Sequence, residues 1–443
     1  MTAGTRGEAP SRASDPLAST LVSTQPAGTV SIVDQCRRAK AAARKLAPMA
    51  RAARDAALLG IAAGLRERAE TLLQANAEDV AGGRARGTNE ALLDRLVLDP
   101  KRVEEMARAV EEIAAQDDPL GHILSEWTRP DGLRIRRVAV PIGVIAMIYE
   151  ARPNVTADAS ALCLKAGNAV ILRGGSEAAR SNWTILGVVQ DALTKAGLPR
   201  DAVQMLPPGD RAAIAELLHQ TDTVDLAIPR GGDALLRFVR ENARVPVIAH
   251  AAGVCHLFVD AGADVEMATR IAVNAKLQRP GTCNAIECLL VDAGDAARLL
   301  PPIAAALLEG GCELRGDERT RALVPRANPA TDDDWGHEYV DRILAVRVVD
   351  GIDGALDHVA RYGSGHTEAI CTRNPVHAER WRHEVDAACV VVNASTRLHD
   401  GGQVGMGAEI GTATSKLHWR GTMGAQGLTT FQWVLDGDGQ LRT

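Results

Sequence analysis

Aromatic residues are scarce in this chain, because Phe, Trp and Tyr make up only 3% of its 443 residues. Long hydrophobic segments are also missing. The longest apolar run, 138–149, contains Pro141 and Gly143 and is too short to span a bilayer. The chain has no CxxC pair and no cluster of histidines, which argues against a structural zinc site. The sequence therefore predicts neither a membrane protein nor a bound metal.

Charge of one sign is not concentrated in the chain either. The formal net charge is −6 at pH 7 with both signs spread along the sequence, which argues against a nucleic acid or an anionic membrane as the main partner. With 46% apolar residues, the chain can form two or three domains with buried cores. Several of the eight cysteines lie in apolar, strand-like runs, so we expect a reduced, cytoplasmic protein.

The first 140 residues divide into a tail, a helical region and a hairpin. Residues 1–30 are rich in Ser, Thr, Ala, Gly and Pro without the apolar core of a signal peptide, and we interpret them as a disordered tail. From 33 to about 115 the periodicity is helical, and Asp99 before Pro100 has the pattern of a helix start. The stretch 123–140 predicts two strands around a Pro-Asp-Gly turn, an arm with which the isolated strand 428–435 could pair, here or on another subunit.

From 141 to about 260 strands and helices alternate, which is typical of a parallel sheet covered by helices. The predicted strands are 143–148, 169–173, 202–206, 224–228 and 246–249, and the predicted helices are 154–166, 176–196, 211–219 and 231–241. Strand ends carry YEARPN (149–154), RGGSE (173–177) and PRGGD (229–233). Gly-Gly before a helix admits a phosphate to the helix start, which favours a dinucleotide site at these ends. The ordinary GxGxxG fingerprint is absent.

A second alternating unit runs from 256 to about 407, with predicted strands at 256–260, 286–291, 343–349, 368–371 and 388–393. It contains NAKLQRPGTCNAIE (274–287), in which Cys283 follows a Gly-Thr turn. A cysteine in a turn is either a small apolar filler or an exposed nucleophile. Its polar neighbours Arg279 and Asn284 favour the nucleophile. The glycine-rich stretch 393–411 predicts a long loop, either functional or disordered.

These motifs, together with IPRGG, HEYVDRILAVRVVD, RYGSGHTEAI and NASTRLHDGGQVGMGAEIGTATSKLHWRG, resemble the gamma-glutamyl phosphate reductases, a divergent branch of the aldehyde dehydrogenase superfamily. The resemblance covers about 33–434. It implies an α/β, aldehyde dehydrogenase-like fold with two parallel-sheet domains and a small β oligomerisation arm. The implied parts are the tail 1–30, an NADP-binding domain 31–254 with the hairpin 123–140, a catalytic domain 255–425 and a C-terminal strand 426–443.

The resemblance implies NADPH-dependent reduction of L-glutamyl 5-phosphate to L-glutamate 5-semialdehyde and phosphate, the second step of proline biosynthesis. Cys283 would attack the acyl phosphate and hold a thioester, which hydride then reduces. The Asn154 amide and the Cys283 N–H would stabilise the oxyanion. Asn154 has the alternative role of an N-cap.

The cofactor and substrate positions also follow from the resemblance. Glu338 matches the carboxylate that binds the cofactor ribose, and Arg173 with Ser176 would admit the 2′-phosphate of NADP(H). The glycines expected near the cofactor are Gly174, Gly175, Gly231 and Gly232. Arg279 would meet the phosphate or the substrate carboxylate, unless it is a plain surface residue, and the amino-acid end would contact Ser395, Thr396 and Arg397.

Three rival functions are weighed against this one: a coenzyme A-acylating dehydrogenase, a non-catalytic scaffold, and a thiol hydrolase using His250, His256 or His366. Relatives that oxidise to free acids carry a Glu before the nucleophile. The matching position falls near Ala249, and 245–259 contains no carboxylate. We therefore expect a thioester that resists water, unless His250 acts as the base. The expected partners are L-glutamyl 5-phosphate and further copies of the chain, and a complex with glutamate 5-kinase is left open.

Overall fold

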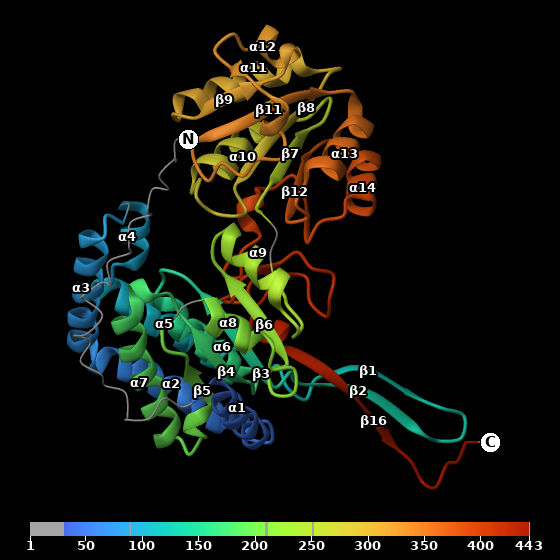
Figure 1. The fold of residues 1–443 in the computed structure, drawn as a ribbon. Coiled ribbons are helices and arrows are strands. Elements are labelled where there is room, and N and C mark those ends of the chain that lie inside the picture. The colour runs from blue at the N-terminus through green and yellow to red at the C-terminus, as the bar shows by residue number, and fades with distance from the viewer. Residues whose placement is uncertain (1–30, 89, 209–210, 250–251, 443) are drawn as a thin grey trace, which may run out of the picture. The chain divides into compact units, whose positions relative to one another are not determined.

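The computed structural model describes residues 31–442 except 89, 209–210 and 250–251 (Figure 1). The predicted tail, 1–30, and His250 lie outside the described residues. Within the chain, the contacts group 32–443 into one compact unit. No helix in the described ranges is long and apolar enough to cross a membrane.

The first sheet has four parallel strands in the order β5-β4-β3-β6. Its strands are β3 (Val144–Tyr149), β4 (Ala169–Arg173), β5 (Val203–Met205) and β6 (Leu226–Arg230). All six residues of β3 are buried, as expected for a parallel strand covered on both faces. The helices that share its core are α1 (Ile32–Leu46), α2 (Arg51–Glu67), α3 (Ala69–Ala85), α5 (Pro100–Ala115), α6 (Asn154–Lys165), α7 (Ala179–Lys195), α8 (Arg211–Leu218) and α9 (Asp233–Asn242).

Two local predictions in this region have different outcomes. Asp99 does cap α5, since its side chain accepts the Arg102 N–H at 2.7 Å. The predicted strand 246–249 is reduced to a single parallel bridge between Val247 and Ala227. Pro246 has no N–H to donate, and only its carbonyl takes part, accepting from Ala227 N at 2.8 Å. The helices α3 (Ala69–Ala85) and α4 (Glu90–Leu96) complete the N-terminal region.

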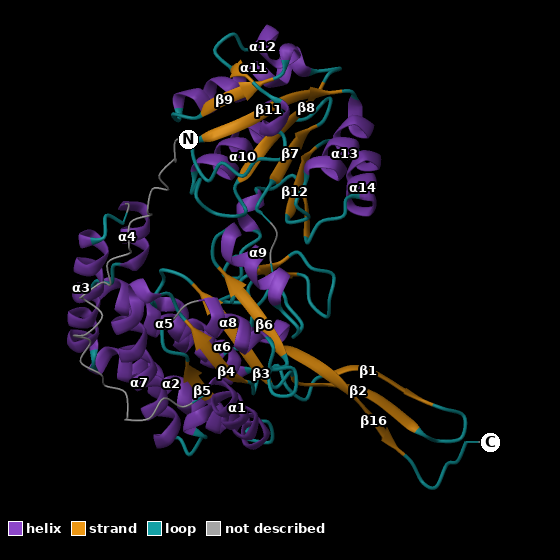
Figure 2. Ribbon diagram, viewed as in Figure 1, coloured by secondary structure: helices purple, strands orange, loops and turns teal. Residues whose placement is uncertain are grey.

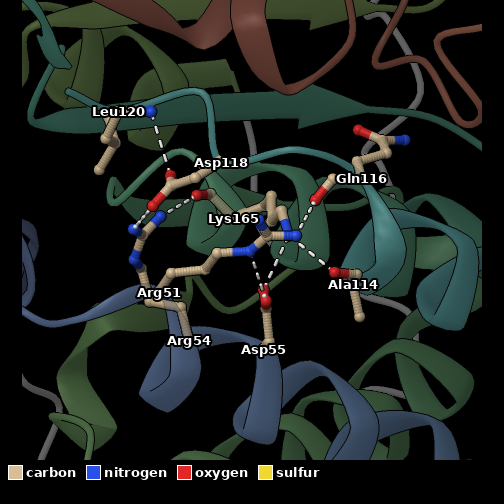
Figure 3. Close-up of polar contacts among 8 residues, drawn as sticks. All are labelled: Arg51, Arg54, Asp55, Ala114, Gln116, Asp118, Leu120 and Lys165. Carbon is tan, nitrogen blue, oxygen red and sulfur yellow. Dashed lines mark hydrogen bonds and ion pairs between the residues drawn. The ribbon is translucent and has the colours of Figure 1, made fainter. Parts of the chain in front are cut away.

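A buried polar cluster ties α2, α5 and α6 together (Figure 3). The ammonium group of the fully buried Lys165 donates to the Asp55 carboxylate at 2.8 Å and to the Ala114 carbonyl at 2.7 Å. Arg54 donates to the Lys165 carbonyl and forms an ion pair with Asp118 at 2.7 Å. Because buried charges are tolerated only when paired, this cluster fixes how the helices meet.

The second sheet has seven parallel strands in the order β10-β9-β11-β8-β7-β12-β13. Its strands are β7 (Cys255–Val259), β8 (Ile286–Asp292), β9 (Glu313–Gly316), β10 (Asn328–Pro329), β11 (Ile343–Val349), β12 (Thr367–Cys371) and β13 (Cys389–Val392). Side chains alternate between two faces: Leu257 and Val259 pack with α10 (Val265–Leu277) and α11 (Ala296–Glu309), whereas Phe258 packs with α13 (Gly351–Tyr362) and α14 (Pro375–Glu384). The sequence did not predict β9 and β10, or α12 (Glu318–Leu323), because these short segments lack apolar periodicity.

A three-stranded antiparallel sheet forms the predicted arm (Figure 2). It consists of β1 (Ile123–Thr128), β2 (Arg134–Pro141) and β16 (Thr429–Asp436). The predicted pairing of the C-terminal strand is found, and it joins β16 to β2 within the same chain. A short two-stranded sheet, β14 (Thr412–Ala413) with β15 (Gly421–Thr422), precedes the arm. The predicted α/β fold with two parallel sheets and a β arm is found, whereas the domain limits stay predictions.

Candidate active site

Cys283 lies in a tight turn between α10 and β8. The Thr282 hydroxyl donates to the Arg279 carbonyl at 2.8 Å, and Ala285 N donates to the Thr282 carbonyl at 2.9 Å. Cys283 is only partly buried, whereas six of the eight cysteines are buried. The main chain of Gly253 lies directly against it, because a Cβ at 253 would be 2.6 Å from Cys283 Cα. The turn therefore packs against the main chain at position 253, where only glycine leaves enough room.

The glycine-rich loop is hydrogen-bonded to this turn through Asn284. Asn284 donates to the His399 carbonyl at 3.0 Å, and its own carbonyl accepts from the Thr396 hydroxyl at 2.6 Å. Arg397 donates to the Asn284 side-chain oxygen and to Gln278 at 2.9 Å. The loop is thus an ordered part of the site. Thr396 is fully buried in this role and the Ser395 hydroxyl accepts from Arg397 N, so both support the loop.

The charges around Cys283 act on its thiol in opposite directions. Burial raises the pKa of Cys283 above its ordinary value, the positive charge of Arg230 opposes this, and Glu409 and Glu338 reinforce it. Burial thus disfavours the thiolate form, and the charge of Arg230 favours it. A nearby positive charge such as that of Arg230 lowers the pKa of the thiol and so increases the fraction of nucleophilic thiolate.

Arginines gather around the nucleophile. The pKa of Arg152 is lowered by lost hydration and by repulsion from Arg230, Arg95 and Arg279, while Cys283 opposes the shift. The pKa of Arg397 is lowered by burial and by Arg279, again with Cys283 among the opposing groups. In the part of the chain that the structure describes, Arg152, Arg230 and Arg279 form no ion pair with a carboxylate. Such a cluster is suited to bind anions.

Arg152 and Arg230 were missed as candidates by the sequence reading. Both stand in the strand ends YEARPN and PRGGD, where the roles expected from the sequence fall on Asn154 and on Gly231 and Gly232 instead. The helix and strand pattern cannot show that these ends reach the Cys283 turn. Only the tertiary structure brings them together.

Glu409 is a second residue that the sequence did not indicate. Its carboxylate accepts the Gly401 N–H at 2.8 Å, and burial raises its pKa, with Arg230 opposing. Arg230 packs on Gly411, where a Cβ would lie 2.8 Å from its guanidinium nitrogen. The loop thus supplies a carboxylate near Cys283, although the segment 245–259 contains none.

Removing the charge of Arg230 tests this electrostatic arrangement. We expect Arg230→Gln to slow alkylation of Cys283 by iodoacetamide at neutral pH roughly tenfold, because loss of a nearby positive charge raises the thiol pKa further. The pH profile of alkylation should move to higher pH. Arg37→Gln on the exposed face of α1 is the control and should leave the profile unchanged. An unaltered profile in Arg230→Gln would contradict the arrangement.

The predicted cofactor residues other than Glu338 lie at the carboxyl ends of β4 and β6. Gly174 and Gly175 follow β4 and are required by close contacts, since a Cβ would lie 2.3 Å from the Asn182 amide nitrogen and 2.1 Å from a Glu177 oxygen, respectively. Arg173 donates to the Gly174 carbonyl at 3.3 Å, and Ser176 is exposed at the start of the following helical turn.

The glycines after β6 are tied to the neighbouring strand. Gly232 N donates to the Glu150 carboxylate at 3.0 Å, and a Cβ at Gly231 would lie 2.4 Å from the same group. The Glu177 carboxylate accepts from Ala151 N at 2.6 Å. Both carboxylates are therefore engaged by main-chain groups.

Asn154 is the first residue of α6 and is exposed, and its amide donates to Asp158 at 2.9 Å. The alternative N-cap role is wrong, because Pro153 holds the cap position and no side chain caps the helix. Glu338 approaches the nucleophile, since a Cβ at Gly253 would lie 2.7 Å from its carboxylate oxygen.

Two of the histidines weighed as a thiol-activating base are engaged elsewhere. His366 Nδ1 contacts the Thr367 hydroxyl at 2.7 Å and the Cys255 sulfur at 3.6 Å. His256 Nδ1 lies 2.9 Å from the Glu368 carboxylate. This arrangement does not favour the thiol hydrolase.

Three buried side chains offer ligand atoms within 4.8 Å of one another: His256, Cys288 and His358. Arg347 donates to His358 Nδ1 at 3.0 Å, because a guanidinium has no acceptor. Burial lowers the pKa of His358 to about 3, so its other nitrogen carries the proton and faces the Cys288 sulfur at 3.6 Å. In this tautomer His358 Nε2 has no lone pair to offer a metal and faces the Cys288 sulfur instead.

The chain is similar to known proteins in both sequence and fold. A family model described as "Aldehyde dehydrogenase family" matches residues 4–320. The gamma-glutamyl phosphate reductase of Sorangium cellulosum is 58% identical over 412 residues, which are 92% of this chain and 96% of that protein. The crystal structure of gamma-glutamyl phosphate reductase from Thermotoga maritima is similar with a TM-score of 0.91 and 44% identity, covering 93% of this chain and 100% of that one.

An acetylating aldehyde dehydrogenase from Geobacillus thermoglucosidasius is similar with a TM-score of 0.65 and 18% identity, covering 93% of this chain and 97% of that one. At that identity the likeness concerns the fold alone.

Proposed function

Because this chain belongs to the aldehyde dehydrogenase family, and within it to the gamma-glutamyl phosphate reductases, we propose that it reduces L-glutamyl 5-phosphate to L-glutamate 5-semialdehyde with release of phosphate. The observation that carries the proposal is the partly buried Cys283 surrounded by the arginines of four separate segments, Arg152, Arg230, Arg279 and Arg397. This would be a step of proline biosynthesis, in the cytoplasm.

The chemistry begins at Cys283. Its thiolate attacks the acyl carbon of the substrate, the bond from carbon to the phosphate oxygen breaks, and phosphate leaves with the electron pair. The enzyme then holds the glutamyl group as a thioester. NADPH, when bound, supplies the hydride that reduces this group to the level of the aldehyde. Collapse of the resulting hemithioacetal releases the semialdehyde and returns the thiolate.

The arginines serve the anionic ends of the substrate, which carries a phosphate and an α-carboxylate. We assign Arg230 and Arg152 to the phosphate, because Arg230 is the strongest positive influence on the thiol that attacks beside it. We assign Arg279, in the nucleophile turn, and Arg397, in the glycine-rich loop, to binding the α-carboxylate. Bidentate arginine contacts would orient both groups.

The oxyanion of each tetrahedral species would be stabilised by the Cys283 N–H and the Asn154 amide. The Asn154 amide nitrogen carries two hydrogens, so it has a second one for the oxyanion beside the one donated to Asp158. Such a donor is worth roughly 10²–10³ in rate.

The proposed cofactor is NADP(H), held by Glu338, Arg173, Ser176 and the glycines 174, 175, 231 and 232. The fit is supported by the location of Arg173, Ser176 and the glycines at or directly after the last residues of two parallel strands, at the carboxyl ends where ligands of such sheets bind. An assay in the oxidative direction tests the function: purified protein, glutamate semialdehyde, phosphate and NADP, followed by nicotinamide absorbance. The proposal requires activity here and none with coenzyme A in place of phosphate.

We predict a preference for NADPH over NADH, because exposed Ser176 and Arg173 leave room and positive charge for a 2′-phosphate. Ser176→Glu should raise KM for NADPH at least about tenfold and that for NADH little, since it sets a carboxylate against the phosphate. Ser176→Gln, of equal size without charge, is the matched control. Equal effects of Glu on both cofactors would contradict the placement.

We propose that the arm assembles the chain into a homo-oligomer. Trp127 and Trp433 are 44% and 55% exposed, although their ring centroids lie only 5.6 Å apart. β16, which carries Trp433, is an edge strand of the arm. We predict that Trp433→Glu lowers the mass measured by light scattering. Lys101→Glu, at an exposed position of α5, should leave the mass unchanged. A monomeric native chain would refute the assembly. A complex with glutamate 5-kinase can be sought in the same experiment.

A further inference from the structure

The segment that carries Glu338 adopts a backbone conformation that is unfavourable for its own residues. Val340 has a φ of +57°, the left-handed region that β-branched residues rarely enter. Its side chain is 46% exposed, so burial contributes little to hold it there. Strain of this kind persists only where the surroundings enforce it, and it occurs frequently at functional sites.

Two anchors enforce the conformation. On one side the Tyr339 hydroxyl donates to Asp334 at 2.6 Å, and Arg315 pairs with the same carboxylate at 2.8 Å. On the other side the N–H of Val340 itself donates to Glu287 Oε1 at 3.4 Å. The strained residue is therefore held directly by the second anchor.

Glu287 belongs to a fully buried ion pair. Its other oxygen accepts from the Lys276 ammonium at 2.5 Å, and the two side chains are 1% and 0% exposed. Lys276 lies on α10 and Glu287 on β8, one on each side of the Cys283 turn. Burial raises the pKa of Glu287 to about 7 while Lys276 opposes the shift. The cost of removing two charges from water offsets most of their attraction, so a gain in stability does not by itself account for this pair.

The anchored segment 338–340 carries Glu338, the carboxylate proposed to bind the cofactor ribose, and it lies next to the Cys283 turn. The Glu338 carboxylate approaches Gly253, which lies against Cys283, and Val340 lies near Gly281 of the same turn, where a Cβ would be 3.8 Å from its carbonyl. Movement of Val340 would therefore displace Glu338 relative to Cys283.

We propose that the Lys276–Glu287 pair is a positioning device that holds Val340 in its strained conformation and so places Glu338 for the cofactor ribose. The inference rests on the proposed cofactor role of Glu338. Glu287 and Lys276 are positioning residues, since they act through the 338–340 segment.

The test measures the NADPH dissociation constant by fluorescence. Glu287→Gln keeps the size of the side chain but loses the charge, and we expect the dissociation constant to rise roughly tenfold. The matched control is Glu368→Gln, which alters an equally buried carboxylate in the same sheet that pairs with His256 instead. Its dissociation constant should change less than about twofold. An unchanged constant in Glu287→Gln, or equal losses in both variants, would overturn the proposal.

A rescue distinguishes positioning from general damage. Glycine adopts a positive φ without strain, so Val340→Gly should restore most of the NADPH affinity in the Glu287→Gln background. Failure of this rescue would overturn the proposal. Should the single variant not fold, the double variant Lys276→Gln/Glu287→Gln removes both charges and carries the same comparisons. Glu338→Gln separates the two proposals: normal NADPH binding there refutes the cofactor role, whereas weak binding there with normal binding in Glu287→Gln refutes only the positioning.

Discussion

Replacing Cys283 by alanine is expected to lower turnover by roughly 10⁴-fold or more, because no acyl-enzyme can form without the thiolate. NADPH affinity and the melting temperature should stay nearly unchanged. Cys283 is only partly buried in a turn, so the smaller side chain removes little packing. The measurement is semialdehyde oxidation with phosphate and NADP, alongside calorimetry and cofactor titration.

Cys389→Ala is the matched control, since Cys389 is the other partly buried cysteine and lies on the strand β13. It should retain activity. The buried cysteines should also tolerate Ala or Ser with activity retained, at some cost in stability. Substantial turnover by Cys283→Ala would rule out the thioester mechanism altogether.

Omitting phosphate should slow oxidation of the semialdehyde by about 10²-fold or more, with arsenate able to replace it. A thioester is hydrolysed efficiently only when a positioned base activates water, which contributes about 10²–10⁴. The segment 245–259, where relatives that oxidise to free acids carry this base, has no carboxylate. Phosphate needs no such base, because it is already a nucleophile.

The control variants are His250→Ala and Glu409→Gln, assayed with and without phosphate. If phosphate-free oxidation proceeds at a comparable rate and is lost in one of them, that residue is the hydrolytic base and the expectation is wrong. The pH dependence of the phosphate-free rate shows whether Glu409 acts as the base. A group with a raised pKa becomes a base only as pH rises, so any hydrolysis through Glu409 should increase toward alkaline pH.

The local sequence determined most of the longer strands and indicated the nucleophile. The strands 169–173 and 343–349 were predicted to the residue, because an apolar run between turn residues describes a strand buried on both faces. Cys283 stood out because polar neighbours and Pro280 placed it in a turn. The motifs around it also sufficed to identify the family.

The tertiary structure alone decided which charges meet at the thiol. Arg152, Arg230 and Glu409 come from segments more than fifty positions from Cys283 in the chain, and no local periodicity records that distance in space. Val340 illustrates the same limit: its sequence preference is for extended backbone, and the buried Lys276–Glu287 pair overrides that preference. Local patterns report how a segment folds on its own, whereas burial and charge depend on the neighbours that folding brings together.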